Sequence, residues 1–288
     1  MKISAGSCLI ESLPFVYCLL YDKKQLFCDF CLKELSKCYQ CSRCKLMFFC
    51  SKECQISDWS IHQHECKSFV KLNENIKLKQ EFKKDLNRIF LRTVIQVKLK
   101  KNEKLSDNYG LKTFDTLIDH YDDLIKDLNR LPQMQKCFHF VKDLMGESFL
   151  TANKLSAKEM ISIFGKLIVN TISISNFDLS ETIGSGIYLS VSSIDHSCQP
   201  NSVVTFNGSK IFVKAIRDFR PDEKPFISYI DILMPKNFRQ KCLLKNYYFF
   251  CKCERCSSES DFVSFIFLEL QCVTVFVTLL KVCFKIVS

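Results

Sequence analysis

Eight of the ten cysteine and histidine residues between residues 28 and 66 are placed at spacings that point to a zinc-binding fold. They form four pairs, two with two intervening residues and two with three: Cys28 and Cys31, Cys41 and Cys44, Cys50 and Cys54, and His62 and Cys66. Two intervening residues let both thiolates of one turn reach the same ion, and three place both ligands on one face of a helix. Eight ligands are enough for two tetrahedral zinc ions. Because a span of 39 residues buries little core, metal binding would supply most of its folding free energy.

The alternatives to two zinc ions are buried free cysteines, or one ion with unused ligands, and the regular pairing disfavours both. His64 lies two residues beyond His62 and in another register, so we expect a surface histidine there. The whole chain has 18 cysteines, and residues 1–20 make a poor secretory signal because Glu11 and Pro14 interrupt their apolar run. The cysteines therefore indicate metal binding in a reducing, intracellular compartment rather than disulfides.

A helical pattern extends from Ser68 to about Gly165. Within it, apolar residues recur at helical spacing and predict one helix with a buried face: Phe114, Leu117, Ile118, Tyr121, Leu124, Ile125 and Leu128. Pro132 predicts the start of the next helix, to about Met145. Ser156 is typical of an N-cap, and it predicts a helix through "KEMISIFGKLIVNTI". The run "KECQISDWSIHQHEC" is compatible with a short helical pair.

Strand-like runs flank this helical region. Residues 1–27 predict one or two short strands around "LIESLPFVYCLL". Beyond Gly184 come "GIYLSVSSI", "SVVTFN", "KIFVKAI" and "PFISYI", separated by turn residues. Residues 262–287 are again apolar. Together these patterns predict a mixed α+β fold.

Three further motifs resemble parts of a SET domain. The run "GIYLSVSSIDHSCQPNSVVTFNG" resembles the segment built around Asn-His-Ser-Cys-x-Pro-Asn, "FISYIDIL" the strand that presents the catalytic tyrosine, and "NYYFFCKCERC" the post-SET segment. Residues 28–66 resemble a MYND finger, including "FCSKECQ…W…HQHEC". Over about residues 1–258 the order of these parts is similar to that of the SET-and-MYND (SMYD) family, in which the finger is inserted after the first SET strands.

The resemblance implies a SET β-fold with an inserted finger, a helical insertion and a zinc-binding post-SET segment. It divides the chain into partial N-terminal SET strands (1–27), the MYND finger (28–66), a helical linker (67–165), the SET core (166–240), the post-SET segment (241–258) and an apolar tail (259–288). The family's interleaved pairing assigns one ion to Cys28, Cys31, Cys50 and Cys54, and another to Cys41, Cys44, His62 and Cys66. Cys251, Cys253 and Cys256 supply three more thiolates, and Cys198 completes a third zinc site; a cysteine-rich turn without metal is the alternative.

The chemistry that the resemblance implies is methyl transfer from S-adenosylmethionine to a lysine amine. Tyr229 and Tyr247 would be the catalytic residues, lining a narrow aromatic channel that keeps the amine neutral by desolvation. Residues expected near the cofactor are Asn170, Asp195, His196, Tyr229 and Phe249. Taken singly, Tyr229 is also compatible with an ordinary strand tyrosine, and Asn170 with a polar helix residue.

The sequence departs from the family's pattern in three places. The Gly-x-Gly turn of the first SET strand does not occur before "SAGSCLIESLPFVYC". Asp195 stands where the family has asparagine, and an ionised aspartate accepts hydrogen bonds without donating any. The apolar tail replaces a long helical C-terminal domain; the alternatives are a mispredicted exon, a buried element, or a tail anchor, which Glu269 would interrupt. We interpret the missing start and the tail together as signs of a truncated gene product.

The formal net charge of +10 favours acidic or polyanionic partners, although much of it lies in helical stretches such as 71–104, where solvated lysines explain it. The first hypothesis is a protein-lysine methyltransferase acting on histone tails or other proteins, as a chromatin regulator in nucleus and cytoplasm. The second is a catalytically impaired adaptor whose finger docks proline-rich peptides. The third is sequence-blind nucleic-acid binding by the finger. We expect no membrane partner. Basic residues in the finger that bear on the last two hypotheses are Lys33, Lys37, Arg43, Lys45 and Lys52.

Overall fold

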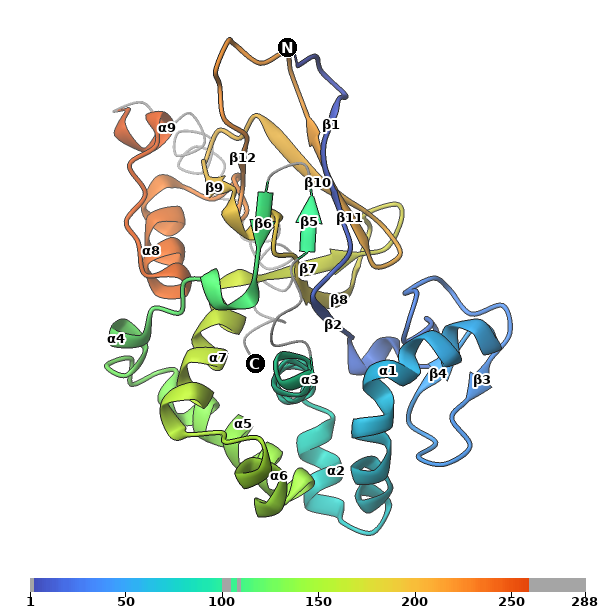
Figure 1. The fold of residues 1–288 in the computed structure, drawn as a ribbon. Helices are drawn as coiled ribbons and strands as arrows, with labels where there is room; N and C mark the ends of the chain where they lie inside the picture. The colour runs from blue at the N-terminus through green and yellow to red at the C-terminus, as the bar shows by residue number, and fades with distance from the viewer. Residues whose placement is uncertain (1–2, 100–104, 108–109, 259–288) are drawn as a thin grey trace, which may run out of the picture. The chain divides into compact units, whose positions relative to one another are not determined.

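A computed structural model of the chain describes residues 3–99, 105–107 and 110–258 (Figure 1). The chain forms two compact units, one of Met1–Asp195 and Asn201–Pro225, the other of His196–Pro200 and Phe226–Ser288. Helices and strands occur in separate runs along the first unit rather than in regular alternation, so the predicted mixed α+β class is confirmed. The apolar tail at 262–287 lies outside the described residues.

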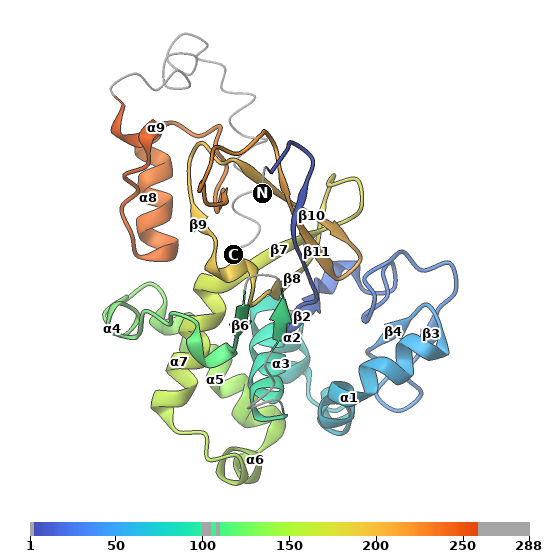
Figure 2. The same ribbon diagram turned by 45° about the horizontal axis from the view of Figure 1, so that its top comes forward.

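Two three-stranded antiparallel sheets are the larger sheets of the first unit, and Figures 1 and 2 show the strands of each side by side. Their orders are β1 (Cys8–Ser12), β11 (Lys210–Ala215), β10 (Ser202–Asn207), and β2 (Val16–Leu19), β8 (Thr182–Ile187), β7 (Thr171–Ser175). In the first sheet Ser12 lies opposite Ile211, and in the second Val16 lies opposite Ile187. The predicted N-terminal strands are therefore present, each paired with a strand far along the sequence.

The helices of the first unit surround α3 (Asp85–Leu99), which is buried over most of its length. It packs against β2, α1, α5 and α7. The helices are α1 (Lys52–Phe69), α2 (Ile76–Phe82), α4 (Tyr121–Leu124), α5 (Leu131–Met145), α6 (Glu147–Ala152) and α7 (Ala157–Asn170), with short 3-10 turns η1 (Tyr21–Lys23), η2 (Val70–Asn73), η3 (Phe114–Thr116) and η4 (Val191–Ser193).

Local signals place several of these helix boundaries where the sequence predicts them. Pro132 stands in the first turn of α5, which ends at Met145. The Ser156 hydroxyl accepts a hydrogen bond from the Glu159 amide, which is the N-cap interaction predicted for α7. The segment after Cys54 is one continuous helix, α1, rather than a helical pair.

The predicted helix from Phe114 to Leu128 is wrong. The segment forms only η3 and the four-residue α4, joined by irregular chain. Phe114, Leu117 and Leu124 are buried, whereas Ile118, Ile125 and Leu128 are exposed, so the segment presents no continuous buried face.

Two features explain the break between η3 and α4. His120 has a left-handed backbone with φ of 47°, which a continuing helix excludes. The carbonyl of Asp119 lies against Gly165 of α7, where a Cβ would come within 2.0 Å of its oxygen. Packing against α7 therefore sets the path of this segment, and the local apolar spacing does not.

Two further stretches of the predicted helical region are extended. Leu105–Asp107 (β5) and Gly110–Lys112 (β6) pair as antiparallel strands. The α7 helix ends at Asn170, two residues before the predicted end, because Thr171–Ser175 pairs with β8 instead. In both places strand pairing overrides the local helical pattern.

One core of buried side chains runs through the first unit and includes residues of the finger (28–66). It joins Phe49 and Cys66 of the finger to Phe69 and Phe90 of the helices. The finger is therefore continuous with the body of this unit. The second unit contains β12 (Phe226–Ile227), which pairs with β9 (Asp195–His196), and helices α8 (Lys236–Tyr247) and α9 (Glu254–Ser257).

Candidate metal centres and active site

Two turns of the same shape begin the finger's ligand set. The Leu32 amide donates to the Cys28 carbonyl at 3.0 Å, and the Lys45 amide to the Cys41 carbonyl at 2.9 Å. Leu32 and Lys45 both have left-handed backbones. Each turn thus brings two cysteines that are separated by two residues to the same side of the chain, as their spacing predicts. The second turn connects β3 (Tyr39–Gln40) to β4 (Phe48–Phe49).

The first centre comprises Cys28, Cys31, Cys50 and Cys54, whose sulfurs all lie within 4.8 Å of one another. The Sγ of Cys50 is 3.6 Å from that of Cys31 and 3.4 Å from that of Cys54. A zinc ion with Zn–S bonds of about 2.3 Å sets ligand sulfurs about 3.8 Å apart, whereas a disulfide needs about 2.05 Å. The four thiols therefore fit a tetrahedral zinc site. A hydrogen bond from Cys31 lowers the pKa of Cys28 to about 5, which favours the thiolate.

The second centre comprises Cys41, Cys44, His62 and Cys66, all buried. The Sγ atoms of Cys41 and Cys66 are 3.7 Å apart, and Nε2 of His62 lies 3.5 Å from both Cys41 and Cys44. His62 and Cys66 lie one turn apart on α1, which also supplies Cys54 to the first centre. The two centres hold the interleaved ligand sets that the family resemblance implies, and the neighbouring His64 is exposed.

The third centre, in the second unit, comprises Cys198, Cys251, Cys253 and Cys256. The Sγ of Cys198 is 3.5 Å from that of Cys256 and 4.0 Å from that of Cys251. The three groups are thus all suited to zinc. The sixteen cysteines within the described ranges are all free thiols. Each centre offers four protein ligands and leaves no open position, which is typical of structural zinc.

Two arginines that no sequence motif singles out lie beside the third centre. Arg239 of α8 is fully buried; one of its nitrogens donates to the Met234 carbonyl at 2.6 Å and another lies 3.6 Å from Sγ of Cys256. Arg255 donates to the carbonyl of Cys198 at 3.1 Å and to that of Ile232 at 2.8 Å. Four thiolates around a divalent ion carry excess negative charge, so positively charged side chains are expected near such a centre.

Four of the predicted site residues form one aromatic cluster in the second unit. Neighbouring rings among His196, Tyr229, Tyr247 and Phe249 have centroid separations of 5.0 to 6.5 Å. The Tyr229 amide donates to Nδ1 of His196 at 3.0 Å, and the Tyr247 hydroxyl donates to the Tyr229 carbonyl at 3.2 Å. Burial, together with the charge of Arg239, lowers the pKa of His196 to about 4, so the ring is neutral at physiological pH.

The other two predicted cofactor residues belong to the first unit. Asn170 is the last residue of α7, and its amide nitrogen donates to the carbonyls of Lys166 at 2.8 Å and Ile118 at 3.1 Å. Asp195 is exposed at the start of β9. The side-chain amide of Asn170 thus has a structural role: it bonds the last turn of α7 through Lys166 and joins it to the segment of Ile118.

A two-centre zinc finger embedded in a mixed α+β body, together with a third cysteine cluster beside paired tyrosines, defines a SET protein with a MYND finger. Comparison with known proteins agrees. The MYND finger family model matches residues 28–66. Human histone-lysine N-methyltransferase SMYD3 is 31% identical over 257 residues, and human N-lysine methyltransferase SMYD2 is 29% identical over 254. Both alignments cover 88% of this chain. The chain belongs to the SMYD family.

The chain spans little more than half the length of these relatives, 57% of human SMYD3 and 56% of human SMYD2. The mouse SMYD3 protein gives a similar result, with 30% identity over 257 residues. Among the described residues, no helix has the length and apolar character needed to cross a membrane.

Proposed function

We propose that the chain is a protein-lysine N-methyltransferase that uses S-adenosylmethionine and acts on histone tails or other proteins. The observation that carries the proposal is the cluster of His196, Tyr229, Tyr247 and Phe249, with ring centroids 5.0 to 6.5 Å apart. The cluster belongs to a chain of the SMYD family, and the two human relatives named above are lysine methyltransferases.

In the proposed reaction the methyl group leaves the sulfonium sulfur and bonds to a neutral lysine nitrogen, which releases a proton to water. Tyr229 and Tyr247 would line the lysine channel, where an aromatic, poorly hydrated surface disfavours the ammonium form. The hydrogen bond between Tyr247 and the Tyr229 carbonyl fixes the two rings relative to each other. His196, held by the Tyr229 amide, and Phe249 would contact the cofactor, together with Asn170 and Asp195.

The three zinc centres would have a structural role in this proposal. Cys198 comes from the loop that follows His196, and its three partners come from the segment that follows Phe249. A zinc ion at the third centre would therefore fix both ends of the aromatic cluster. We also propose that the chain is divided into the six segments that the sequence predicts, and that it acts in nucleus and cytoplasm.

The test is methyl transfer from radiolabelled S-adenosylmethionine to a protein array by the zinc-loaded full chain. Tyr229→Phe and Tyr247→Phe remove single hydroxyls, and Tyr39→Phe in the exposed part of the finger is the matched control. We expect transfer to lysine that falls at least tenfold in the two site variants and is unchanged in the control. Transfer that is equal in all four proteins would contradict the roles assigned to the two tyrosines.

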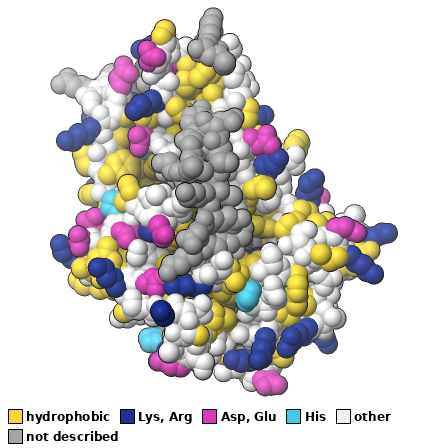
Figure 3. Space-filling view, in the orientation of Figure 1, with side chains coloured by type: hydrophobic (Ala, Val, Ile, Leu, Met, Phe, Trp, Pro, Cys, Tyr) yellow, Lys and Arg dark blue, Asp and Glu magenta, His cyan; other side chains and the backbone are white. Residues whose placement is uncertain are grey.

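A second candidate is a protein-docking adaptor, favoured by the exposed surface of the finger. Ile56 is 73% exposed and Trp59 43%. Lys33, Lys37, Arg43, Lys45 and Lys52 are all exposed too, and Figure 3 shows basic side chains over the β3–β4 hairpin at the right-hand edge. Such a surface suits a proline-rich peptide or, without base reading, nucleic acid. A Trp59→Ala variant that keeps its zinc but loses peptide binding, in a chain that does not bind S-adenosylmethionine, would favour the adaptor.

A further inference from the structure

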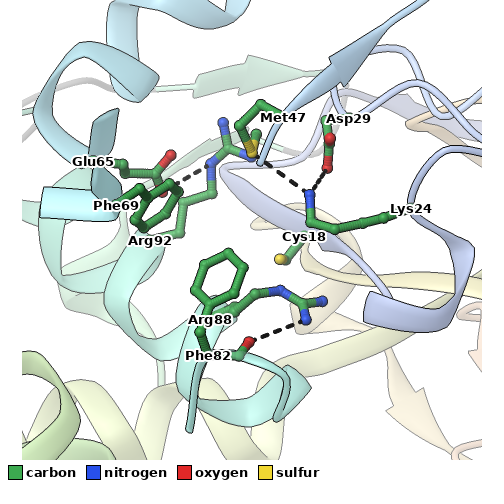
Figure 4. A pocket seen from close by; sticks show the side chains of 9 residues that line it. All are labelled: Cys18, Lys24, Asp29, Met47, Glu65, Phe69, Phe82, Arg88 and Arg92. Atoms are coloured by element: carbon green, nitrogen blue, oxygen red, sulfur yellow. Dashed lines mark hydrogen bonds and ion pairs between the residues drawn. The ribbon is translucent and has the colours of Figure 1, made fainter. Parts of the chain in front are cut away.

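Helix α1 of the finger and helix α3 of the helical region bury four ionisable side chains between them. Asp58, His62 and Glu65 come from α1, and Arg92 comes from α3; each is at most 4% exposed. Burying charged groups costs free energy unless they are paired, so their arrangement is informative. Figure 4 shows the side chains of Glu65 and Arg92 pointing toward each other.

The four side chains form a continuous path from α3 to the second centre. The Arg92 guanidinium is hydrogen-bonded to Asp58, and its Nε lies 3.6 Å from Oε1 of Glu65. The other oxygen of Glu65, Oε2, lies 3.5 Å from Nδ1 of His62. The opposite ring nitrogen of His62, Nε2, lies 3.5 Å from the sulfurs of Cys41 and Cys44.

The orientation of His62 assigns a role to each of its nitrogens. Nε2 faces the thiols and would bind the zinc ion, so Nδ1 carries the proton. Within the described part of the chain, Nδ1 of His62 and Oε2 of Glu65 are both buried, and neither has a hydrogen-bond partner. A zinc-bound histidine commonly donates its second N–H to a carboxylate, which fixes the ring and raises its basicity. Glu65 is placed to accept that hydrogen bond.

A small-molecule site in the same place is excluded by size. The cavity lined by Glu65, Arg92 and Arg88 has a volume of about 20 Å³, which is room for about one water molecule. The path therefore connects protein groups to one another. The finger's first centre is attached through Tyr17: its hydroxyl donates to the Phe30 carbonyl at 2.6 Å, and its ring lies under the Arg92 guanidinium at 5.7 Å.

We propose that Glu65 is a positioning residue that holds His62 on the second zinc ion, and that Arg92 holds Glu65 in place from α3. The second ion then links the finger to the helical region, in addition to stabilising the finger itself. Glu65 faces a ligand of the second centre, whereas Arg92 also packs against the Tyr17 ring at 5.7 Å, so weakening the path lowers zinc affinity first at the second centre.

The test is zinc affinity of the full-length chain by competition with a chromogenic chelator. The variants are Glu65→Gln, which keeps shape and removes charge, and Arg92→Met, with the exposed Glu53→Gln on the same helix as the matched control. We expect one of three ions to bind about 10- to 100-fold more weakly in the first two variants. Cobalt-loaded protein identifies the centre, since a Cys₃His site and a Cys₄ site absorb differently.

The expected spectrum loses the Cys₃His contribution first in Glu65→Gln and Arg92→Met, and keeps the Cys₄ contributions. Arg92→Lys, which keeps the charge but not the planar fork, should recover part of the affinity. Wild-type affinity in Glu65→Gln, or equal weakening at all centres, would overturn the proposal. The readout needs no methyl transfer, so failure of the methyltransferase proposal would leave this one standing.

Discussion

Replacing Arg239 by methionine would leave the third centre without its closest buried positive charge. The side chain is fully buried, and its Nη2 lies 3.6 Å from the sulfur of Cys256. Zinc with four thiolates carries a formal net charge of about −2. Methionine fills a similar apolar volume but supplies no charge and no donor for the Met234 carbonyl, which accepts from Arg239 at 2.6 Å.

The size of the effect follows from the burial and the contact distance. At 3.6 Å and an effective dielectric of about 20, a pair of unit charges interacts by about 5 kcal/mol. Removing one partner of a buried charge pair costs about 3–5 kcal/mol in measured cases. We therefore expect Arg239→Met to destabilise the zinc-loaded second unit by about 3–5 kcal/mol.

The assay is denaturant unfolding of the zinc-loaded chain, followed by the zinc released to a chromogenic chelator. We expect Arg239→Met to release one ion at a lower denaturant concentration than wild type, with Arg239→Lys intermediate. The exposed Arg220→Met is the matched control and should behave as wild type. Equal release from Arg239→Met and wild type would refute the idea that Arg239 is the counter-charge of this centre.

Three shorter predictions concern the first unit. Gly208→Ala should cost about 1–3 kcal/mol of stability in denaturant unfolding, because φ is +60° and a Cβ would lie 2.2 Å from the Cys31 carbonyl oxygen; a wild-type midpoint would contradict it. Ser156→Ala should cost about 1 kcal/mol through loss of the α7 N-cap, measured in the same way. Removing zinc with a chelator should increase amide hydrogen exchange at Phe49 and Phe69, because ligand cysteines belong to the same core; unchanged protection would count against that shared core.

Features that depend on short sequence separation were predictable. The two-residue cysteine turns, the Pro132 helix start and the Ser156 cap are each determined within a few residues, and the structure contains all three. The SET motifs were recognisable because several residues recur together in order. No single position indicated that residues from these motifs would pack together in one aromatic cluster.

Features that depend on distant partners were not predictable. The Phe114–Leu128 segment has helical spacing, yet its path is set by contact with Gly165. Residues 171–175 leave the helix because β8 offers a strand to pair with. The partners Glu65 and Arg92 are 27 residues apart, on helices whose packing no local pattern gives. Arg239 looks like an ordinary surface arginine until α8 is placed beside the third centre.

The most direct test of the proposed methyltransferase function is calorimetric titration of S-adenosylmethionine into the purified, zinc-loaded chain, with Asp195→Asn alongside. We expect binding in the micromolar range, roughly −8 kcal/mol. Binding by the variant alone would locate the defect at one carboxylate. No heat of binding from either protein would contradict the methyltransferase proposal and leave the adaptor as the function that the exposed finger surface supports.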